Sequence, residues 1–499
     1  MRCSCCNTNK ILYDILLMFM IFACVPTSAN EVDLFALLDL KRKVLKDPLK
    51  IMSSWNDSMH FCDWIGVICN STIGRVVVLD LEAQSLGGSI PPSLGNLTYL
   101  TEIRFGDNNF YSQIPQEFGR LLQLRHLNLS HNDFDGEIPT NISHCTKLLV
   151  LDLTVNGLVG QIPHQLSTLT MLEQLSTSLI DLSLTQNGLQ GLLPPNIGSN
   201  LPNLQFFLAG INNFSGPIPT SFANISRLQI LDISVNSLTG ILPNNLGSLR
   251  ELEALNFEDN NLGNGKIGDL NFINFLANCT GLQDLGLSHN DLGGPLPPSI
   301  GNLSDQLKRL TLGENVLSGS IPIEIENLIN LQILGMEYNY VNGSIPPNIG
   351  KLQTLGVLYL NDNKLTGPIP SSIGNLSLLT KLFIDRNKLE GSIAPSLGQC
   401  KSLLALDLSH NNLSGSIPNK VIGLSSISIS LALNNNSLSG PLPNEVGQLV
   451  NLAFLDVSDN KLSGNIPSNL GKCISMERLY LGGNRFEGFF PQSLNALKG

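Results

Sequence analysis

The sequence predicts an α/β solenoid, in which short parallel strands form one curved sheet along a concave face. Three observations support this fold. One phrase of about 24 residues recurs along nearly the whole chain. Within each copy, leucines alternate with polar residues over the length of a short strand. A helix-like segment and a pair of cysteines precede the first copy, as expected for a structure that covers the open end of a repeat array.

The clearest copy of the phrase runs from Leu403 to Pro418 and reads LLALDLSHNNLSGSIP. Leu406 and Leu408 fall on one face of a strand, with polar residues on the other face. Asn411 then turns the chain out of the strand, where its amide can bond backbone groups of its own and neighbouring copies. The Gly-x-Ile-Pro segment is expected on the convex side. The phrase is a leucine-rich repeat of about 24 residues.

The asparagine of this phrase tracks the repeats, with a glutamine in a degenerate first copy. The positions are Gln84, Asn108, Asn132, Asn156, Asn187, Asn212, Asn236, Asn260, Asn290, Asn315, Asn339, Asn363, Asn387, Asn411, Asn436, Asn460 and Asn484. Two steps are long, because extra residues fall around Ser176 to Leu182 and in the segment after Asn260. We expect insertions of this kind to form loops on one face. For the first of them, an error in the gene structure is the alternative.

Residues 1–29 are predicted to be a signal peptide. Arg2 and Lys10 flank an apolar run from Ile11 to Val25, and small residues up to Ala29 provide a cleavage site. A signal anchor that stays in the membrane is the alternative, although about 15 apolar residues are few for a span. The mature chain is therefore expected in the secretory pathway.

Residues 30–72 are predicted to form an N-terminal cap. An amphipathic helix over residues 30–48, ended by Pro48, is expected from the helical spacing of Leu34, Leu37, Leu38, Val44 and Leu45. Trp55 and Trp64 follow. Cys62 and Cys69 are expected to form a disulfide, as is common in secreted proteins.

Residues 73–499 are assigned to about 17 repeats, the last of them incomplete or uncapped. The final repeat begins at Leu479 and is followed by no capping motif before Gly499. We expect that the natural protein is longer, or that the gene structure is incomplete.

The pattern LxxLxLxxNxLxGxIPxxLGxL resembles the plant-specific class of leucine-rich repeat. Ser54 to Asn56 and the segment CDWIGVIC resemble the cap of plant receptor kinases. Gly268 to Ser304 resembles the matching segment of the receptor-kinase subfamily that detects bacterial patterns. The resemblance implies the extracellular region of a plant leucine-rich-repeat receptor-like serine/threonine kinase, located at the plasma membrane if a membrane helix follows. Such a region binds a peptide or protein and recruits a co-receptor kinase ectodomain.

Some peptide-hormone receptors of this family carry an Arg-x-Arg pair for the carboxylate of their ligand. No such pair occurs in this sequence, which disfavours that class of ligand. The sequence also lacks the glycine-rich loop, HRD and DFG signatures of a kinase, so the chain itself is not predicted to be an enzyme.

Composition excludes two classes of partner. Charged residues make up 14% of the chain, the net charge is −11, and no basic run occurs. A nucleic-acid-binding protein would show a basic stripe, and a protein bound to anionic lipid would show a basic cluster. No cofactor is predicted.

Other chemical motifs have simpler interpretations. Gly263 to Gly268, GNGKIG, matches a dinucleotide-binding string but lies in a repeat insertion. His126 and His131 share one repeat without a third metal ligand, and Glu258-Asp259 suits a solvated face. Four cysteines at inward repeat positions are interpreted as small buried hydrophobic residues, not metal ligands. They are Cys145, Cys279, Cys400 and Cys473.

Residues that flank the inward leucines are expected on the concave face. Most are small and polar, but four consecutive repeats carry larger aromatic and charged groups, which interfaces favour. We call these residues the candidate patch: Lys308, Arg309, Glu337, Tyr338, Tyr359, Asp362, Phe383, Asp385 and Arg386. Phe206, Leu208 and Ile211 form a second, apolar candidate. Ordinary surface variation along a long array is the alternative for the candidate patch.

Predicted N-glycosylation sites give a second map of the surface. They begin at Asn56, Asn70, Asn96, Asn128, Asn141, Asn213, Asn224, Asn278, Asn302, Asn342, Asn375, Asn412 and Asn435. None of the repeat asparagines begins a sequon, which fits their assignment to buried turns. Asn128 occupies a strand position, where a glycan would direct ligand contacts toward later repeats.

Two functions remain open at this stage. The first is a receptor ectodomain, or a fragment of one, that binds a peptide or protein in plant immune signalling. The second is a soluble secreted binder, such as an inhibitor of a pathogen's wall-degrading enzyme or a decoy. Both would use the same face of the array. A shallow surface of low charge density suits protein or peptide recognition better than a small-molecule pocket.

Overall fold

The computed structural model describes residues 29–168 and 179–496 in two compact units, which divide after Leu158. The predicted signal peptide lies outside these residues except for Ala29. Part of the predicted insertion around Ser176 to Leu182 also lies outside them. The two units are described separately below.

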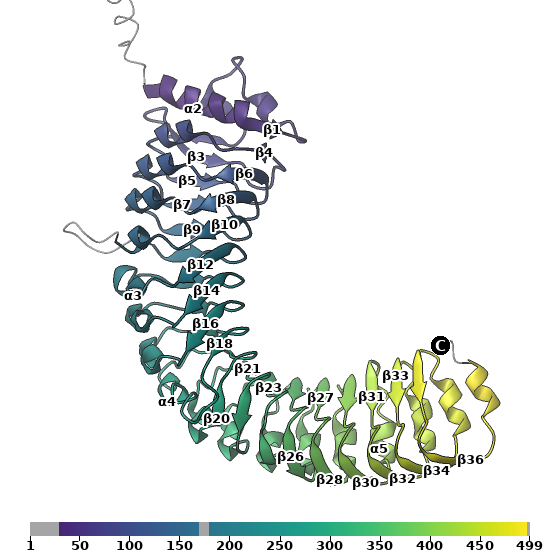
Figure 1. Ribbon diagram of the computed structural model, residues 1–499. Helices are drawn as coiled ribbons and strands as arrows, with labels where there is room; N and C mark the ends of the chain where they lie inside the picture. Colours follow the sequence, from purple (N-terminus) through teal and green to yellow (C-terminus); the bar gives the residue numbers. More distant parts are fainter. Residues whose placement is uncertain (1–28, 169–178, 497–499) are drawn as a thin grey trace, which may run out of the picture. The chain divides into compact units, whose positions relative to one another are not determined.

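The second unit contains a parallel sheet with one strand from each repeat (Figure 1). We call the side of this sheet that points away from the leucine core the concave face. Its strands are β11 (Asp181–Ser183), β13 (Phe206–Leu208), β15 (Ile230–Asp232), β17 (Ala254–Asn256), β19 (Asp284–Gly286), β21 (Arg309–Thr311), β23 (Ile333–Gly335), β25 (Val357–Tyr359), β27 (Lys381–Phe383), β29 (Ala405–Asp407), β31 (Ser430–Ala432), β33 (Phe454–Asp456) and β35 (Arg478–Tyr480). The predicted repeat strands and their parallel stacking are confirmed.

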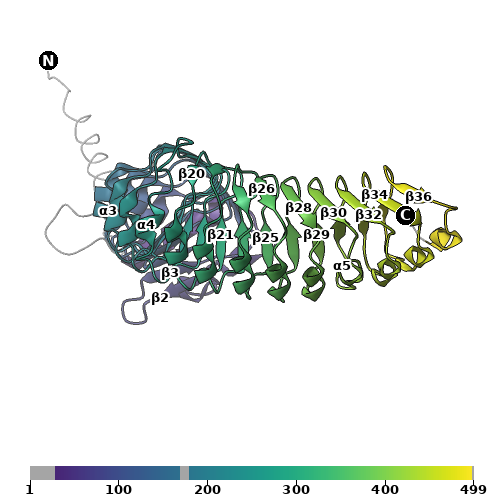
Figure 2. The same ribbon diagram turned by 90° about the horizontal axis from the view of Figure 1, so that it is seen from below.

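A second set of strands lies beside this sheet, after the repeat asparagines (Figure 2). These lateral strands are β10 (Gly157–Gly160), β12 (Gly188–Leu192), β14 (Asn213–Gly216), β16 (Ser237–Gly240), β18 (Asn261–Leu262), β20 (Gly293–Pro295), β22 (Val316–Ser318), β24 (Asn342–Ser344), β26 (Lys364–Gly367), β28 (Lys388–Ser392), β30 (Asn412–Gly415), β32 (Ser437–Gly440), β34 (Lys461–Asn465) and β36 (Arg485–Glu487). The lateral ladder is interrupted between β18 and β20, where the insertion after Asn260 lies.

Short helical turns return the chain to the next strand of the second unit. They are η6 (His164–Thr168), α3 (Ile197–Asn200), η7 (Thr220–Asn224), η8 (Asn244–Ser248), α4 (Ile273–Leu276), η9 (Pro298–Asn302), η10 (Ile323–Asn327), η11 (Pro347–Lys351), η12 (Ser371–Asn375), η13 (Pro395–Gln399), α5 (Asn419–Ile422), η14 (Asn444–Gln448), η15 (Ser468–Lys472) and η16 (Gln492–Ala496). In η12, a Cβ at Gly374 would lie 2.4 Å from the carbonyl oxygen of Ser396 in the next repeat. Glycine is required there by close packing of successive turns.

The first unit repeats this arrangement after its cap. Its main sheet contains β2 (Val67–Cys69), β3 (Val76–Asp80), β5 (Glu102–Arg104), β7 (His126–Asn128) and β9 (Val150–Asp152). Its lateral strands are β1 (Val44–Lys46), β4 (Gly87–Gly88), β6 (Asn109–Gln113) and β8 (Asp133–Glu137). Its helical segments are α2 (Ala29–Lys43), η1 (Ile51–Ser54), η2 (Phe61–Asp63), η3 (Pro92–Asn96), η4 (Gln116–Arg120) and η5 (Thr140–His144). Strand β2 pairs antiparallel with β3 and so begins the sheet.

The core is built from the repeat leucines. Leu403, Leu406, Leu408 and Leu413 are all fully buried. The four repeat cysteines are buried as predicted, and none is bonded to another. Burial raises the pKa of Cys400 to about 11, so this thiol stays protonated and behaves as a small apolar side chain.

Each repeat asparagine satisfies backbone groups that the turn would otherwise bury without partners. Asn411 accepts a hydrogen bond from the backbone N–H of Leu389 at 2.9 Å. Its amide donates to the carbonyl oxygens of Ile384 at 3.1 Å, Leu408 at 3.2 Å and Ser409 at 3.0 Å. Two of these partners belong to the preceding repeat, so one side chain joins two repeats. Equivalent contacts surround Asn315, Asn339, Asn363 and Asn387.

The residue before each repeat asparagine adopts a left-handed backbone conformation. At His410 the φ angle is +51°, and its backbone N–H donates to the carbonyl oxygen of Asn434 in the next repeat at 2.9 Å. This backbone conformation is unusual for a residue other than glycine. It lets the hydrogen-bond ladder continue beyond the end of each short strand.

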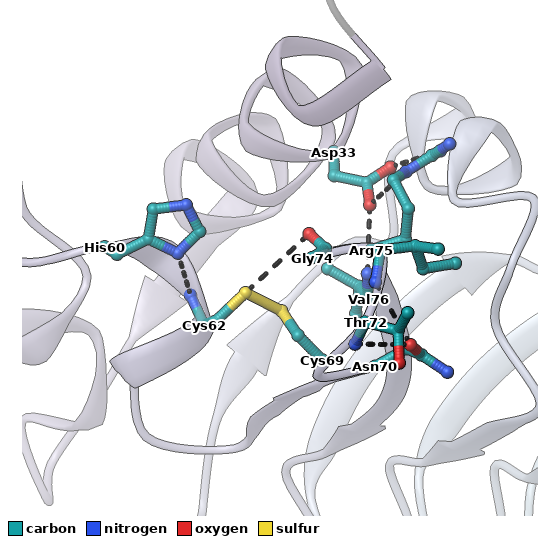
Figure 3. Close-up of a disulfide and its surroundings, with 10 residues drawn as sticks. Asp33, His60, Cys62, Cys69, Asn70, Thr72, Gly74, Arg75 and Val76 are labelled. Atoms are coloured by element: carbon teal, nitrogen blue, oxygen red, sulfur yellow. Dashed lines mark hydrogen bonds and ion pairs between the residues drawn. A yellow bond between two sulfur atoms is a disulfide. The ribbon is translucent and has the colours of Figure 1, made fainter.

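The cap depends on a buried ion pair that the sequence did not reveal (Figure 3). Asp33, on α2, is fully buried and accepts hydrogen bonds from Arg75 Nε at 2.9 Å and Arg75 Nη2 at 2.8 Å. The same carboxylate accepts from the backbone N–H of Val76 at 3.0 Å, at the start of β3. Because the Asp33 carboxylate binds both the Arg75 guanidinium and the backbone of β3, the capping helix is fixed to the first strand.

The predicted Cys62–Cys69 disulfide is present, with a Cα–Cα distance of 5.4 Å (Figure 3). The rings of Trp55 and Trp64 stack beside it, with centroids 5.3 Å apart. The Trp55 indole N–H donates to the carbonyl oxygen of Ile65 at 2.9 Å. The aromatic segment therefore forms a small core over the first repeat.

The predicted helix over residues 30–48 is wrong in its C-terminal part. Helix α2 ends at Lys43, and β1 follows and pairs antiparallel with β4. A Cβ at Gly88 would lie only 2.1 Å from the carbonyl oxygen of Lys43, so the glycine permits this approach. Pairing covers the free edge of the lateral ladder, and Leu45 is left 76% exposed.

None of the helices in the described part of the chain combines the length and the apolarity needed to cross a bilayer.

We expect Asn411→Ala to lower the free energy of unfolding by about 3 kcal/mol, because buried backbone groups of two repeats lose their partners. Urea unfolding followed by circular dichroism measures this change. Asn469→Ala is the matched control, since Asn469 is only half-buried and its amide makes one bond, to the carbonyl oxygen of Asn444. Equal unfolding midpoints for the two variants would disprove the role assigned to the asparagine.

We expect Asp33→Asn to destabilise the cap by about 3 kcal/mol, because Arg75 loses its buried counter-charge. Limited proteolysis should then cleave within residues 29–75 sooner than in the wild type. Asp57→Asn, an exposed carboxylate in the same cap, provides the control. Identical cleavage rates in both variants would show that the ion pair does not hold the helix.

Candidate ligand-binding surface

The candidate patch has an aromatic pair at its centre. Tyr359 and Phe383 are the third residues of β25 and β27, and they pair in register. Their ring centroids lie 5.2 Å apart with the planes tilted by 30°, and both side chains are half-buried. The pair results from strand register, because equivalent positions of neighbouring strands face the same side of a sheet. The predicted proximity of these two residues is therefore observed.

In other repeats the same strand position carries a residue that stabilises the turn. Asp407 accepts hydrogen bonds from the backbone N–H of Ser409 at 2.9 Å and from its hydroxyl at 2.6 Å. Asp456 makes the same contacts with Ser458. An aspartate here is therefore occupied by its own turn. Tyr359 and Phe383 cannot make these turn contacts, and their half-buried rings present aromatic surface on the concave face instead.

Arg309, which the sequence assigned to the candidate patch, is paired within the protein. Its guanidinium donates to Glu258 at 2.7 and 2.9 Å and to Asp284 at 3.1 and 3.3 Å. Glu258 also accepts from the hydroxyl of Thr311 at 2.5 Å. Lys308 donates to Gln283 at 2.8 Å. Both cations therefore already have partners from preceding repeats.

Three residues of the candidate patch lie in the left-handed turn position and not in a strand. Tyr338, Asp362 and Arg386 have φ angles of +50°, +51° and +51°. Arg386 Nε lies 3.9 Å from a carboxylate oxygen of Asp362 and 3.9 Å from one of Asp385. Tyr338 is 53% exposed. This part of the candidate patch therefore consists of side chains that extend from the turns after the strands.

Burial and mutual repulsion disfavour ionisation of several carboxyl groups on this face. Burial, followed by the charge of Asp407, raises the pKa of Asp385 to about 7. Burial also raises the pKa of Glu337, Asp284 and Asp407 above their ordinary values. These carboxyl groups on the concave face therefore hold a proton to higher pH than they would in solvent.

The second candidate surface lies on β13 and the turn after it. Phe206 and Leu208 are half-buried strand residues, and Ile211 is 45% exposed with a φ angle of +54°. Leu208 is in register with Asp232, so polar strand residues adjoin this apolar surface. Its role in ligand binding stays a prediction.

Most of the sequon asparagines are exposed, whereas Asn56, Asn128 and Asn141 are half-buried. Asn128 is the last residue of β7, as predicted. It accepts hydrogen bonds from the N–H of Ser130 at 2.9 Å and from its hydroxyl at 2.7 Å, and donates to Glu82 at 3.3 Å. Asn128 thus performs the turn-stabilising function of aspartate in other repeats. Its glycosylation stays a prediction.

The glycine-rich insertion from Gly263 to Gly268 encloses a carboxylate of the protein itself. Asp269 is 2% exposed and accepts from the backbone N–H groups of Asn264 at 3.0 Å, Lys266 at 3.2 Å and Gly293 at 3.0 Å. These N–H groups are the donors that a phosphate would need. The loop therefore has a structural explanation for its glycines, and the dinucleotide match is coincidental.

His126 and His131 are also placed outside any metal centre. His126 Nδ1 lies 3.7 Å from Glu102. No group of three or more potential ligands suited to a metal ion occurs within residues 29–168 and 179–496.

Family models for leucine-rich repeats match several segments along the chain. Residues 30–70 match the family described as leucine rich repeat N-terminal domain. Six segments match the family described as Leucine Rich Repeat, at residues 123–145, 227–249, 281–303, 354–376, 402–424 and 451–473. Together with the lateral strands and the disulfide cap, these matches define a leucine-rich-repeat recognition region.

Similar proteins narrow this class to plant receptors. The LRR receptor-like serine/threonine-protein kinase EFR of Arabidopsis thaliana is 42% identical over 389 residues, which cover 65% of this chain and 38% of that protein. The Arabidopsis receptor kinase HAESA, solved with the peptide hormone IDA and the co-receptor SERK1, is 31% identical with a TM-score of 0.70. That alignment covers 93% of this chain and 88% of the HAESA chain.

The plant peptide hormone receptor RGFR1, solved with RGF2, is 32% identical with a TM-score of 0.70, and covers 85% of this chain and 72% of that chain. This chain belongs to the plant leucine-rich-repeat receptor-like kinase family. It spans about two fifths of the length of EFR. Its residues correspond to the cap and repeats and carry no kinase signature.

We expect Asp385→Asn to stabilise the protein at pH 8 by on the order of 2 kcal/mol and to have little effect at pH 4. A carboxyl group with a raised pKa in the folded state contributes stability below its unfolded pKa near 4. That contribution is lost as the pH rises through about 7. The asparagine cannot ionise and avoids this loss.

Urea unfolding at pH 4, 6 and 8 measures the effect of Asp385→Asn. The exposed Asp291→Asn is the control for a change of one charge. Parallel stability profiles for wild type and Asp385→Asn across this pH range would contradict the prediction.

Proposed function

We propose that this chain is the extracellular recognition region of a plant receptor, and that it binds a peptide or protein ligand on the candidate patch. The observation that carries this proposal is the Tyr359–Phe383 pair. A half-exposed aromatic pair stands where neighbouring strands have glycine, threonine or aspartate. Aromatic side chains provide much of the binding energy in protein interfaces at a small loss of conformational freedom.

The comparisons support a peptide as the ligand. HAESA and RGFR1 were each solved with a peptide hormone, and both share the repeat architecture of this chain. The HAESA structure also contains a co-receptor, SERK1. By analogy, we propose that a co-receptor kinase ectodomain joins this chain once its ligand is bound.

The role in immune signalling is the finer part of the proposal. It rests on the resemblance of Gly268 to Ser304 to the receptor-kinase subfamily that detects bacterial patterns, and on the similarity to EFR. Residues 279–304 of this segment form an ordinary repeat with buried Leu282, Leu285 and Leu287. The part that differs from other repeats is the loop held by Asp269.

An extracellular location is supported by two features of the described residues. The Cys62–Cys69 disulfide is characteristic of oxidising compartments. Most sequon asparagines are exposed, as glycosylation requires. Location at the plasma membrane follows from the family and is part of the proposal.

The test is a selection from a displayed library of random 14-residue peptides on the purified, secreted chain. We expect the combined substitution Tyr338→Ala, Tyr359→Ala and Phe383→Ala to weaken the selected peptides at least tenfold, because truncated aromatic anchors lose about 2 kcal/mol or more. Affinity is measured by biolayer interferometry.

Tyr480→Ala is the matched control. Tyr480 is the third residue of β35 and contacts Phe454, with ring centroids 5.8 Å apart, but it lies outside the candidate patch. Peptides that bind the triple variant and the wild type equally would refute the proposal. Inhibition of a wall-degrading enzyme by both proteins would instead favour a secreted inhibitor that uses another face.

A further inference from the structure

The aromatic pair adjoins a carboxylate at the next strand position. Gly335 lies in register beside Tyr359 and has no side chain. The space over it is occupied by Glu337, whose Oε2 would lie 3.0 Å from a Cβ at Gly335. Glu337 Oε1 would lie 2.6 Å from a Cβ at Gly313 in the preceding repeat. The Glu337 carboxylate therefore packs against the backbone of Gly335 and Gly313, next to the aromatic pair.

This carboxylate lacks a complete set of partners. Glu337 Oε2 is buried and accepts no hydrogen bond from the described residues. Burial is the main reason that the pKa of Glu337 is raised. A buried carboxylate oxygen without a donor is unfavourable, and such an atom in a native structure calls for an external donor.

Three cations of the same face are already engaged by other groups of the protein. Arg309 is bound by Glu258 and Asp284, and Lys308 is bound by Gln283. Arg386 lies between two carboxylates of its own turn and the preceding one. These three cations have partners within the protein, whereas Glu337 Oε2 has no hydrogen-bond donor among the described residues.

The concave face from β17 to the turn after β29 has an excess of acidic groups. Its carboxylates are Glu258, Asp259, Asp284, Glu314, Glu337, Asp362, Asp385 and Asp407. Its cations are Lys308, Arg309, Lys381 and Arg386. Eight carboxyl groups thus face four cationic side chains. Although the pKa of Asp385 is raised to about 7, this excess of acidic groups attracts a positively charged ligand and repels an acidic one.

We propose that the candidate patch takes a cationic peptide, which lays an apolar side chain on Tyr359 and Phe383 and donates an Arg or Lys group to Glu337. This inference rests on the proposed function and specifies its ligand class. An aromatic surface beside a carboxylate suits a long basic side chain, since the alkyl stem covers the ring while the charged end reaches the carboxylate.

The same arrangement disfavours an anionic ligand. A peptide bearing sulfate, phosphate or several acidic residues would meet Glu337, Asp362 and Asp385, while Lys308, Arg309 and Arg386 are already engaged within the protein. The acidic face would also repel the free C-terminal carboxylate of a peptide. We therefore expect the Arg or Lys of the ligand at an internal position of the peptide, next to an apolar residue.

The test uses the peptides selected on the intact chain from the random 14-residue library. Some of these peptides should bind the wild type but not the variant with Tyr338→Ala, Tyr359→Ala and Phe383→Ala. We expect these patch-dependent peptides to be enriched in Arg and Lys next to an apolar residue. Their affinity should fall about tenfold for Glu337→Gln, which keeps the shape of the side chain and removes its charge. It should also fall as NaCl rises from 50 to 300 mM, because salt screens the charges.

Asp305→Asn is the control, because Asp305 is exposed and lies in the loop before β21. It removes the same charge and should leave affinity unchanged, and circular dichroism verifies that each variant is folded. Patch-dependent peptides that are neutral or acidic, or that are insensitive to Glu337→Gln, would overturn this inference and leave the proposed function standing. A selection without any patch-dependent peptide would overturn both.

Discussion

The structure depends on satisfying backbone hydrogen bonds in the turns between repeats. These turns are packed between neighbours, where water cannot serve the N–H and C=O groups. One asparagine amide in each repeat replaces that water, as Asn411 does for Leu389, Ile384 and Leu408. Because each amide links its own repeat to the preceding one, stability passes from neighbour to neighbour along the array.

This arrangement separates the residues that hold the fold from those that face a ligand. Leucines and asparagines form the interior, so the outward strand positions are free to vary. In many repeats these positions still assist the turn, as Asp407 does through Ser409. Where an aromatic residue replaces the aspartate, as at Tyr359 and Phe383, the repeat loses a local contact and gains surface suited to recognition.

Periodicity in the sequence was sufficient to predict the fold, the strand register and the Tyr359–Phe383 contact, because each follows from residue spacing. Side-chain ion pairs between residues far apart in the sequence were not predictable from the repeat spacing. The ion pair of Asp33 with Arg75 joins the helix to a strand 42 positions away. Arg309 reaches Glu258 across two repeats, which removes it from the free part of the candidate patch. The end of α2 at Lys43 was missed because an edge strand, not helical propensity, determines it.

The loop enclosed by Asp269 shows how an array of this kind can acquire new shapes. A single internal carboxylate accepts from the backbone N–H groups of Asn264, Lys266 and Gly293, and β17 still pairs with β19 in the main sheet. The insertion therefore does not interrupt the main sheet. Its outer residues, such as Ile267 at 86% exposure, can change without a penalty to the core. Diversification among related receptors can thus proceed at one repeat while the others remain unaltered.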